Sequence, residues 1–502
     1  MTAVHADTRS DVRLLSRSVI IGVALLAVAI VLLMVALATS DQPIHAIVWG
    51  GLAFTTCAAS YLWLIGARYG VGLGLAGWRF GTWTLLWYGI TFGIASITFI
   101  QPQIGTSSQI SLTSVLRALW LVGIAMTVWT LGYLAGPGEP LRRFATRRMQ
   151  ALGRRFTTEV RGIWAPWILY AIGSGARIAF AVTSGRFGYV GDASSAFLTA
   201  GSSYGQILSA LSLCAPLAVC AAAFQVFRER LPIARITLTL LFLTEFAIGA
   251  ASGAKQSFII LTLAIIVPYS GARRRLPKAA LIVAAAAFML IIIPFTSAYR
   301  GAALEGEAEL STSQAINAAP GILSQTVTPH NIATVLPSSA DYLLQRIREI
   351  DSPAIILQRT PQQIAFRNPT QLVEAPIVEI VPRALWANKP IMTSGYILNR
   401  EYYDTASDTY SSSSLTPMGS LYQYGGWLPV IAGMLVLGCG ARLLDDIIEI
   451  DANPHSVLLL LLLFPNLVKS EQGWVDLVAS IPQTIAIWLL ACLITFRLQR
   501  PV

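Results

Sequence analysis

Arginines in a late polar segment are the residues of this chain best suited to chemistry. The segment runs from Arg300 to Gly425 and interrupts a sequence otherwise dominated by Leu, Ala, Ile and Val. Arginine binds the oxygens of a diphosphate through two parallel N–H bonds and needs no metal to do so. Arg300 ends an apolar run, and Arg383 stands between Pro382 and Trp386 in an apolar stretch. We expect both to bind an anion of this kind.

Five other residues of the segment are candidates for a site. Arg348 and Lys389 could bind an anion, Asp351 and His330 could take a proton, and the ring of Tyr422 could stack on a sugar. Three of them have a plainer alternative. Arg348 also fits a solvated helix face, a lone histidine in a loop is more often incidental, and tyrosines form the usual interface belt of membrane proteins.

Charged residues also occur inside or beside the apolar runs, where a charge is costly unless it is paired or hydrated. Arg177 and Glu245 each lie within such a run, and Lys255 lies at the turn between two of them. We expect Arg177 and Lys255 to contact substrate in a cavity. The alternatives are that Arg177 pairs with Glu245, and that Lys255 and Arg300 extend to the membrane interface.

Composition places the chain in a membrane. Of its 502 residues, 55% are hydrophobic and 12% are charged, whereas soluble domains carry about 25% charged residues. The net charge of +10 would suggest nucleic acid for a soluble protein. Here the basic residues lie in the connections where the positive-inside rule expects them, so we expect a lipid bilayer and no nucleic acid as partner.

About twelve apolar runs are long enough to span a bilayer, and in lipid each must be a helix because only a helix satisfies its own backbone. The sequence therefore predicts an all-α polytopic membrane protein. The expected spans are 18–39, 45–66, 81–100, 115–135, 163–184, 204–226, 236–253, 256–270, 279–298, 426–444, 456–468 and 477–496.

The basic clusters predict the orientation. With twelve spans and a cytoplasmic N-terminus, the clusters near 142–161, 228–235 and 273–278 all face the cytoplasm, together with the C-terminus. The large loop between the ninth and tenth spans then faces outward. This divides the chain into spans 1–9 (1–299), an extracytoplasmic loop (300–425) and spans 10–12 (426–502).

The loop is expected to contain one amphipathic helix over Ser339–Leu357, in which Leu343, Ile347 and Ile350 recur at helical spacing. All five cysteines fall in apolar runs, so neither a disulfide framework nor a cysteine metal site is indicated. Nucleotide-binding loops and HExxH motifs are also missing from the sequence. We therefore expect no metal and no cofactor.

Five motifs together resemble the Wzy-type O-antigen and exopolysaccharide repeat-unit polymerases. They are SGAKQSF (252–258), SAYRG (297–301), RIREIDSPAIILQRTP (346–361), VPRALWANKP (381–390) and SLTPMGSLYQYGG (414–426). In that family a late outer loop carries a Pro-Arg…Trp…Lys-Pro signature and then a Pro…Gly…Tyr…Gly-Gly segment. The resemblance covers roughly residues 245–430. Lys255 departs from it, since arginine is expected at that position in many relatives.

The resemblance implies a reaction on the outer face of a bacterial inner membrane. A hydroxyl of one lipid-linked repeat unit attacks a glycan carried on polyprenyl diphosphate, and polyprenyl diphosphate leaves. Arg300 and Arg383 would stabilise the leaving group, with Arg177 as a deeper partner. Asp351, Glu349 and His330 remain open as the base. Other polysaccharide assembly proteins are the implied protein partners.

Three alternatives remain. A ligase that moves finished glycan to a different acceptor would share the donor chemistry. A glycosyltransferase using polyprenyl-phosphate sugars would need an acidic pair in the first outer loop, which offers only Asp41. A polysaccharide or lipid transporter would predict related halves of the chain, and we find no internal repeat.

Overall fold

A computed structural model describes most of the chain. The described residues are 8–69, 75–103, 105–188, 190–191, 202–304, 343–381, 394–405, 412–451, 453–469 and 471–499, with the isolated positions 199, 314, 317–318, 321–322, 324 and 386.

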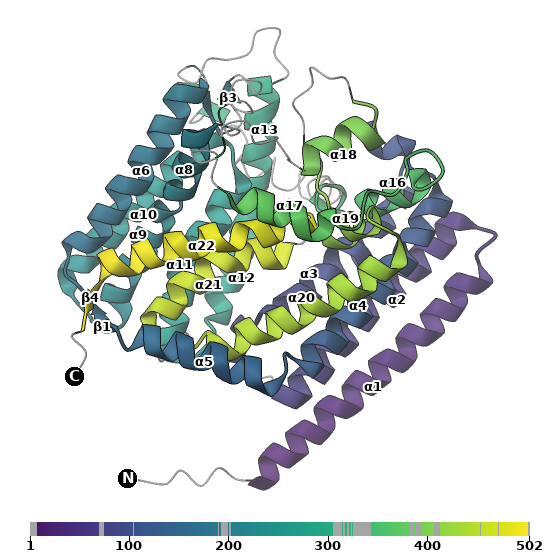
Figure 1. The fold of residues 1–502 in the computed structure, drawn as a ribbon, viewed down its shortest axis with the longest axis horizontal. Helices are drawn as coiled ribbons and strands as arrows, with labels where there is room; N and C mark the ends of the chain where they lie inside the picture. The colour runs from purple at the N-terminus through teal and green to yellow at the C-terminus, as the bar shows by residue number, and fades with distance from the viewer. Residues whose placement is uncertain are drawn as a thin grey trace.

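Helices dominate the described residues (Figure 1). Their bounds are α1 (Thr8–Ala38), α2 (Pro43–Tyr69), α3 (Phe80–Tyr88), α4 (Leu112–Ala135), α5 (Glu139–Gly153), α6 (Trp164–Ser184), α8 (Ser203–Ser212), α9 (Cys214–Phe227), α10 (Pro232–Ser252), α11 (Lys255–Arg273), α12 (Lys278–Ala287), α13 (Ile293–Leu304), α16 (Asp351–Arg359), α17 (Gln371–Ile380), α18 (Ser394–Tyr402), α19 (Pro417–Tyr422), α20 (Trp427–Ile447), α21 (Pro454–Lys469) and α22 (Trp474–Thr495).

The prediction of a helical, polytopic membrane protein is confirmed. Within the described ranges, 11 helical stretches are long and apolar enough to cross a membrane, and a shorter apolar helix covers Pro454–Val468. Each predicted span overlaps one of these twelve stretches. Many large apolar side chains on them are exposed, for example Val182 at 77% and Leu428 at 76%, as expected for surfaces that contact lipid tails rather than water.

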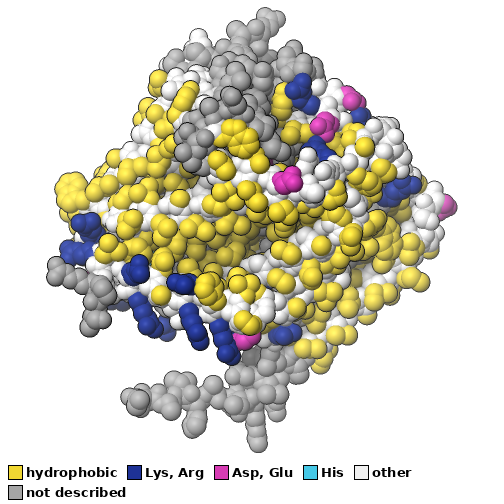
Figure 2. Space-filling view, viewed as in Figure 1, with side chains coloured by type: hydrophobic (Ala, Val, Ile, Leu, Met, Phe, Trp, Pro, Cys, Tyr) yellow, Lys and Arg dark blue, Asp and Glu magenta, His cyan; other side chains and the backbone are white. Residues whose placement is uncertain are grey.

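The molecule has two contrasting ends (Figures 1 and 2). Along one end, below an apolar band, lies a row of Lys and Arg side chains over α5, which exposes Arg142, Arg143, Arg147 and Arg148. Helices α16 and α18 lie at the opposite end. We call these the basic face and the loop face. The start of α1 and strand β4 both lie at the basic face (Figure 1).

A short sheet at the basic face departs from the all-helical expectation. Strand β1 (Phe156–Val160) pairs antiparallel with β4 (Phe496–Leu498), with Phe156 opposite Leu498 and Val160 opposite Phe496. The rings of Phe156 and Phe496 are buried. The pairing therefore holds the connection after α5 against the end of α22.

Two hydrophobic cores share α3. The first is built mainly from α9, α11, α21 and α22, and the second from α2, α4, α16, α19 and α20. Phe80 packs in the first core, and Leu85 and Tyr88 in the second. Asp445 fixes the start of α3, because its carboxylate accepts hydrogen bonds from the backbone N–H groups of Phe80 (2.7 Å) and Gly81 (3.2 Å), which is where a helix favours negative charge.

The third predicted span, 81–100, is not one regular helix. After α3 the chain forms a π-helical turn, η2 (Gly89–Gly93), and then a 3-10 helix, η3 (Ile94–Ile100). The cause is close contact with α2: the Thr55 hydroxyl donates to the Gly89 carbonyl at 3.0 Å, and a Cβ on Gly93 would lie 2.1 Å from Thr55 Oγ1. Small residues permit such an approach, and the irregular turns follow from it.

The prediction of a single amphipathic helix over 339–357 is wrong. Residues 343–346 are helical, the chain then turns, and α16 begins at Asp351. Pro353 supplies a physical reason, because its missing N–H suits the first turn of a helix and would break the interior of a longer one. The predicted loop thus contains several short helices, of which α17 packs against α22, and α16 against α4 and α19.

Candidate functional site

Arg348 lies at the centre of a buried polar network on the loop face. Its side chain is only 2% exposed, so its alternative interpretation as part of a solvated helix face is wrong. Nε and Nη2 donate to the two oxygens of Asp351 at 2.6 and 2.9 Å, and Nη1 donates to Thr98 Oγ1 at 2.9 Å. The guanidinium carbon also lies 3.9 Å from the centre of the Phe99 ring. All three guanidinium nitrogens therefore have protein acceptors.

Asp351 is equally engaged. Besides Arg348, its Oδ2 accepts a hydrogen bond from Ser107 Oγ at 2.6 Å. The pKa of nearby Tyr403 is raised by burial and further by the Asp351 carboxylate, so this phenol stays neutral. Since both carboxylate oxygens already accept hydrogen bonds, the geometry favours a positioning role for Asp351 and Arg348: they hold the start of α16 on η3. The catalytic and substrate-binding roles predicted for them stay untested.

The last motif, SLTPMGSLYQYGG, forms a buried helix and a tight reversal. Thr416 caps α19 by accepting from the N–H of Gly419 at 3.2 Å. Gly425 and Gly426, with φ of 143° and 74°, then turn the chain into α20 in a region of backbone space open mainly to glycine. Tyr422 is buried, with its ring 5.8 Å from that of Phe366.

This motif meets RIREIDSPAIILQRTP in space. Ser414 donates to Glu349, the backbone N–H of Thr416 lies 3.4 Å from Ser352 Oγ, and a Cβ on Gly419 would lie 3.0 Å from Ile356. Two motifs about sixty residues apart therefore share one packed unit against α4 and α20.

Arg177 and Glu245 form an ion pair, as one of the alternatives anticipated. Arg177 Nη1 lies 3.0 Å from Glu245 Oε1, and Nη1 and Nη2 each lie 3.2 Å from Oε2. The pair joins α6 to α10, and Glu245 is 8% exposed. Pairing of this kind explains how two charges are tolerated within membrane-spanning helices.

SAYRG contacts the residue that precedes SGAKQSF. The Tyr299 hydroxyl donates to the Ala251 carbonyl at 2.7 Å, next to the turn that leads to Lys255, the first residue of α11. A hairpin of β2 (Arg186–Phe187) and β3 (Val190–Gly191) approaches the same turn, since a Cβ on Gly188 would lie 2.2 Å from the Ser252 carbonyl oxygen. Arg300 follows Tyr299 within α13. Lys255 and Arg300 thus lie close to the same contact between α10 and α13.

Three predicted residues lie outside the described residues: Arg383 and Lys389 of the VPRALWANKP motif, and His330. The structure neither brings them to the site nor removes them from it. Their roles stay predictions.

Arg117 is a loop-face cation that the sequence analysis missed. It lies in the second turn of α4 and is exposed; within the described ranges no carboxylate lies within ion-pair distance of it. Burial raises the pKa of Tyr422, and the positive charge of Arg117 opposes that rise, so the two lie near each other. The available signal was a single arginine inside an otherwise apolar span.

Among the described residues, no group of three or more His, Cys, Asp and Glu side chains is arranged to hold a metal ion. Arg348 and Arg177 are held by carboxylates, whereas no carboxylate of the described residues pairs with Arg117.

Residues 177–450, more than half of the chain, match the model of one protein family, described as Domain of unknown function (DUF8712). The chain belongs to this family. No curated protein and no solved structure matches it. The matched segment begins at Arg177 and includes all nine residues predicted for the site, but excludes Arg117.

Proposed function

We propose that this protein is an integral-membrane glycosyltransferase that polymerises lipid-linked oligosaccharide repeat units. It has twelve spans with both termini in the cytoplasm of a bacterium, and the loop face is the extracytoplasmic face of the inner membrane. The donor is a glycan carried on polyprenyl diphosphate. The observation that carries the proposal is that SLTPMGSLYQYGG packs on RIREIDSPAIILQRTP, and that SAYRG contacts the residue before SGAKQSF, near the loop-face ends of the helices.

The reaction needs no nucleotide. A hydroxyl oxygen of the incoming lipid-linked unit forms a bond to the anomeric carbon of the donor glycan, and the bond from that carbon to the diphosphate oxygen breaks. The hydroxyl proton passes to a base or to the departing diphosphate, which is already a good leaving group. Arg300 and Arg383 stabilise its charge. Arg348 and Arg177, each held by a carboxylate, position the surrounding helices.

The test uses purified protein in nanodiscs, given a polyprenyl-diphosphate-linked oligosaccharide without nucleotide or added metal, with products sized on a gel. We expect a ladder spaced by one repeat unit. Arg383→Ala should abolish it in a protein that remains folded, and Arg300→Lys should impair it severely. Arg346→Ala, an exposed neighbour of the buried network, is the control and should retain activity. Normal ladders from Arg383→Ala would refute the site assignment.

The same assay separates the alternatives. A ligase would transfer one glycan to a different acceptor and give a single shifted product. A transporter would carry the lipid-linked glycan intact across the bilayer of a proteoliposome.

A further inference from the structure

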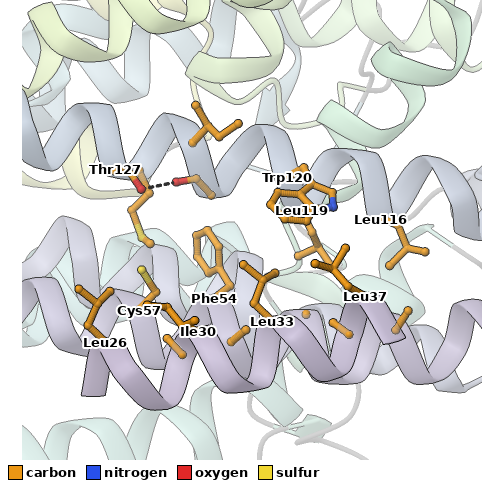
Figure 3. Close-up of a pocket in the computed structure, with 18 of the residues that line it drawn as sticks. Leu26, Ile30, Leu33, Leu37, Phe54, Cys57, Leu116, Leu119, Trp120 and Thr127 are labelled. Atoms are coloured by element: carbon orange, nitrogen blue, oxygen red, sulfur yellow. Dashed lines mark hydrogen bonds between the residues drawn. The ribbon is translucent and has the colours of Figure 1, made fainter. Parts of the chain in front are cut away.

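An apolar groove lies between α1 and α4 (Figure 3). Helix α1 packs on α2 through small residues: Gly22, Ala29 and Ala36 are buried in α1, and Ser60 of α2 donates to the Gly22 carbonyl at 2.7 Å. Helix α4 packs on another part of α2. The space left between α1 and α4 is open to the outside and measures about 300 Å³.

The groove lies along the parts of α1 and α4 nearest the loop face. Its wall on α4 runs from Leu116 to Thr127, and its wall on α1 from Leu26 to Leu37. Each wall covers eleven residue steps, or about 16 Å at 1.5 Å per residue, which is roughly half of the ~30 Å hydrocarbon layer. Both walls end close to the loop-face ends of their helices. The groove therefore has the length of one membrane leaflet.

Its surface is suited to hydrocarbon. Aliphatic side chains and the Phe54 ring line most of it (Figure 3), and its two inner hydroxyl groups are satisfied by the protein, since those of Tyr61 and Thr127 bond to each other at 2.9 Å. Thr127 Oγ1 also lies 2.9 Å from the Gly123 carbonyl oxygen. Gly123 leaves the middle of the wall open, because a Cβ there would meet no atom within 4 Å.

An exposed arginine lies on α4 among the groove residues nearest the loop face. Arg117 follows the groove residue Leu116 and precedes the groove residue Trp120 by one turn. It is the sixth residue of α4, close to the loop-face end of that helix. An apolar channel one leaflet long with a cation at its mouth matches a lipid that carries a phosphate on a long chain.

We infer that this groove holds the polyprenyl chain of the lipid-linked substrate, with its first phosphate beside Arg117. The inference rests on the proposed function for the identity of the lipid. It adds the position of the polyprenyl chain, and it assigns a role to α1, α2 and α4, which precede the segment matched by the family.

The test measures binding without turnover, so that it is independent of polymerase activity. Protein in detergent is titrated with polyprenyl monophosphate that carries no glycan, and the bound fraction is measured by native mass spectrometry. Gly123→Phe should place a ring in the open middle of the groove and raise Kd by at least tenfold. Gly175→Phe on α6 is the matched control, since Gly175 is exposed and also has no atom within 4 Å of a Cβ. It should bind as the wild type does.

Arg117→Gln tests the headgroup. A hydrogen bond to a charged group contributes roughly 1.5–3 kcal/mol, so the Kd for polyprenyl monophosphate should rise about tenfold or more, while binding of uncharged polyprenol should not change. If Gly123→Phe lowers the melting temperature, Gly123→Leu replaces it in the titration.

Two outcomes would overturn the inference: wild-type affinity in the groove-filling variants, or equal affinity of the wild type for phosphatidylglycerol and polyprenyl monophosphate. The second would make the groove a general lipid site. If Gly123→Phe weakens binding but the wild type makes no polymer, the groove binds the lipid and the protein is not a polymerase. If Gly123→Phe leaves the Kd unchanged and gives a normal ladder, the protein is a polymerase and the groove does not hold its substrate.

Discussion

Replacing Arg348 with Met should release α16 from the membrane helices. Met keeps much of the length of the side chain but removes the three donors that reach Asp351 and Thr98. Of its hydrogen bonds to described side chains, Asp351 would then retain the one from Ser107. The contact of the guanidinium with the face of the Phe99 ring would also be lost.

The size of the effect follows from burial. The Arg348 side chain is 2% exposed and that of Asp351 is 19% exposed, so the pair is close to a fully buried one. Breaking such a pair by removing one partner costs about 3–5 kcal/mol. If α16 opens locally, a loss of about 3 kcal/mol multiplies the open population by roughly 100.

Hydrogen exchange of the α16 amides, followed by mass spectrometry in nanodiscs, reports that population. We expect exchange in Asp351–Arg359 to accelerate about 100-fold in Arg348→Met, with little change in α10 or α11. Arg346→Met is the matched control, because Arg346 is exposed two residues away, and its α16 amides should exchange at the wild-type rate.

A double variant separates positioning from catalysis. Arg348→Met with Asp351→Leu removes both charges, so its cost should be clearly smaller than the sum of the single variants. If the pair only positions α16, the double variant should also recover part of the polymer yield. Exchange of α16 within threefold of wild type in Arg348→Met would refute the positioning role.

Three further predictions concern other parts of the molecule. Arg177→Met should destabilise the protein by about 3–5 kcal/mol, seen as a lower melting temperature. The double variant Arg177→Met, Glu245→Leu should regain most of this stability. If it does not, Arg177 contributes more than its ion pair. Gly426→Ala should cost about 1–3 kcal/mol, because alanine must adopt a φ of 74°, and an unchanged melting temperature would contradict that account. In a cysteine-free chain, a membrane-impermeant maleimide added to whole cells should label Gln363→Cys. It should label Arg147→Cys only after the cells are permeabilised, and the opposite pattern would mean that the proposed orientation is inverted.

Much of the fold was predictable because lipid imposes simple rules. A run of about twenty apolar residues must be a helix in a membrane, and every predicted span falls on a helical stretch. The break at η2 and η3 was not predictable, since it depends on where Thr55 of α2 meets Gly89 and Gly93. Apolar composition reveals that a segment is buried in lipid, but not which neighbouring helix approaches it closely.

The site was predictable only in part. The Arg177–Glu245 pair was anticipated as an alternative because two opposite charges in spans have few other stable arrangements. Arg348 was harder, because its partner Asp351 is three residues away but its other acceptor, Thr98, is 250 residues away. The Ser-Pro pair at 352–353 could have located the start of α16. Arg117 was overlooked because it lies within an apolar run that was counted as a plain span.

The pairing of β1 with β4 bears on how the protein is made. Arg497 donates its backbone N–H to Thr157 Oγ1, across 340 residues of sequence. At about 5–20 residues per second, the ribosome needs roughly 17–68 s to supply the second strand after the first. During that interval α6 to α22 must enter the bilayer, and Phe156 is not yet covered by β4. The basic face is therefore closed late in biogenesis, and truncation before Phe496 would leave an inserted chain with an open strand edge for quality-control proteases to recognise.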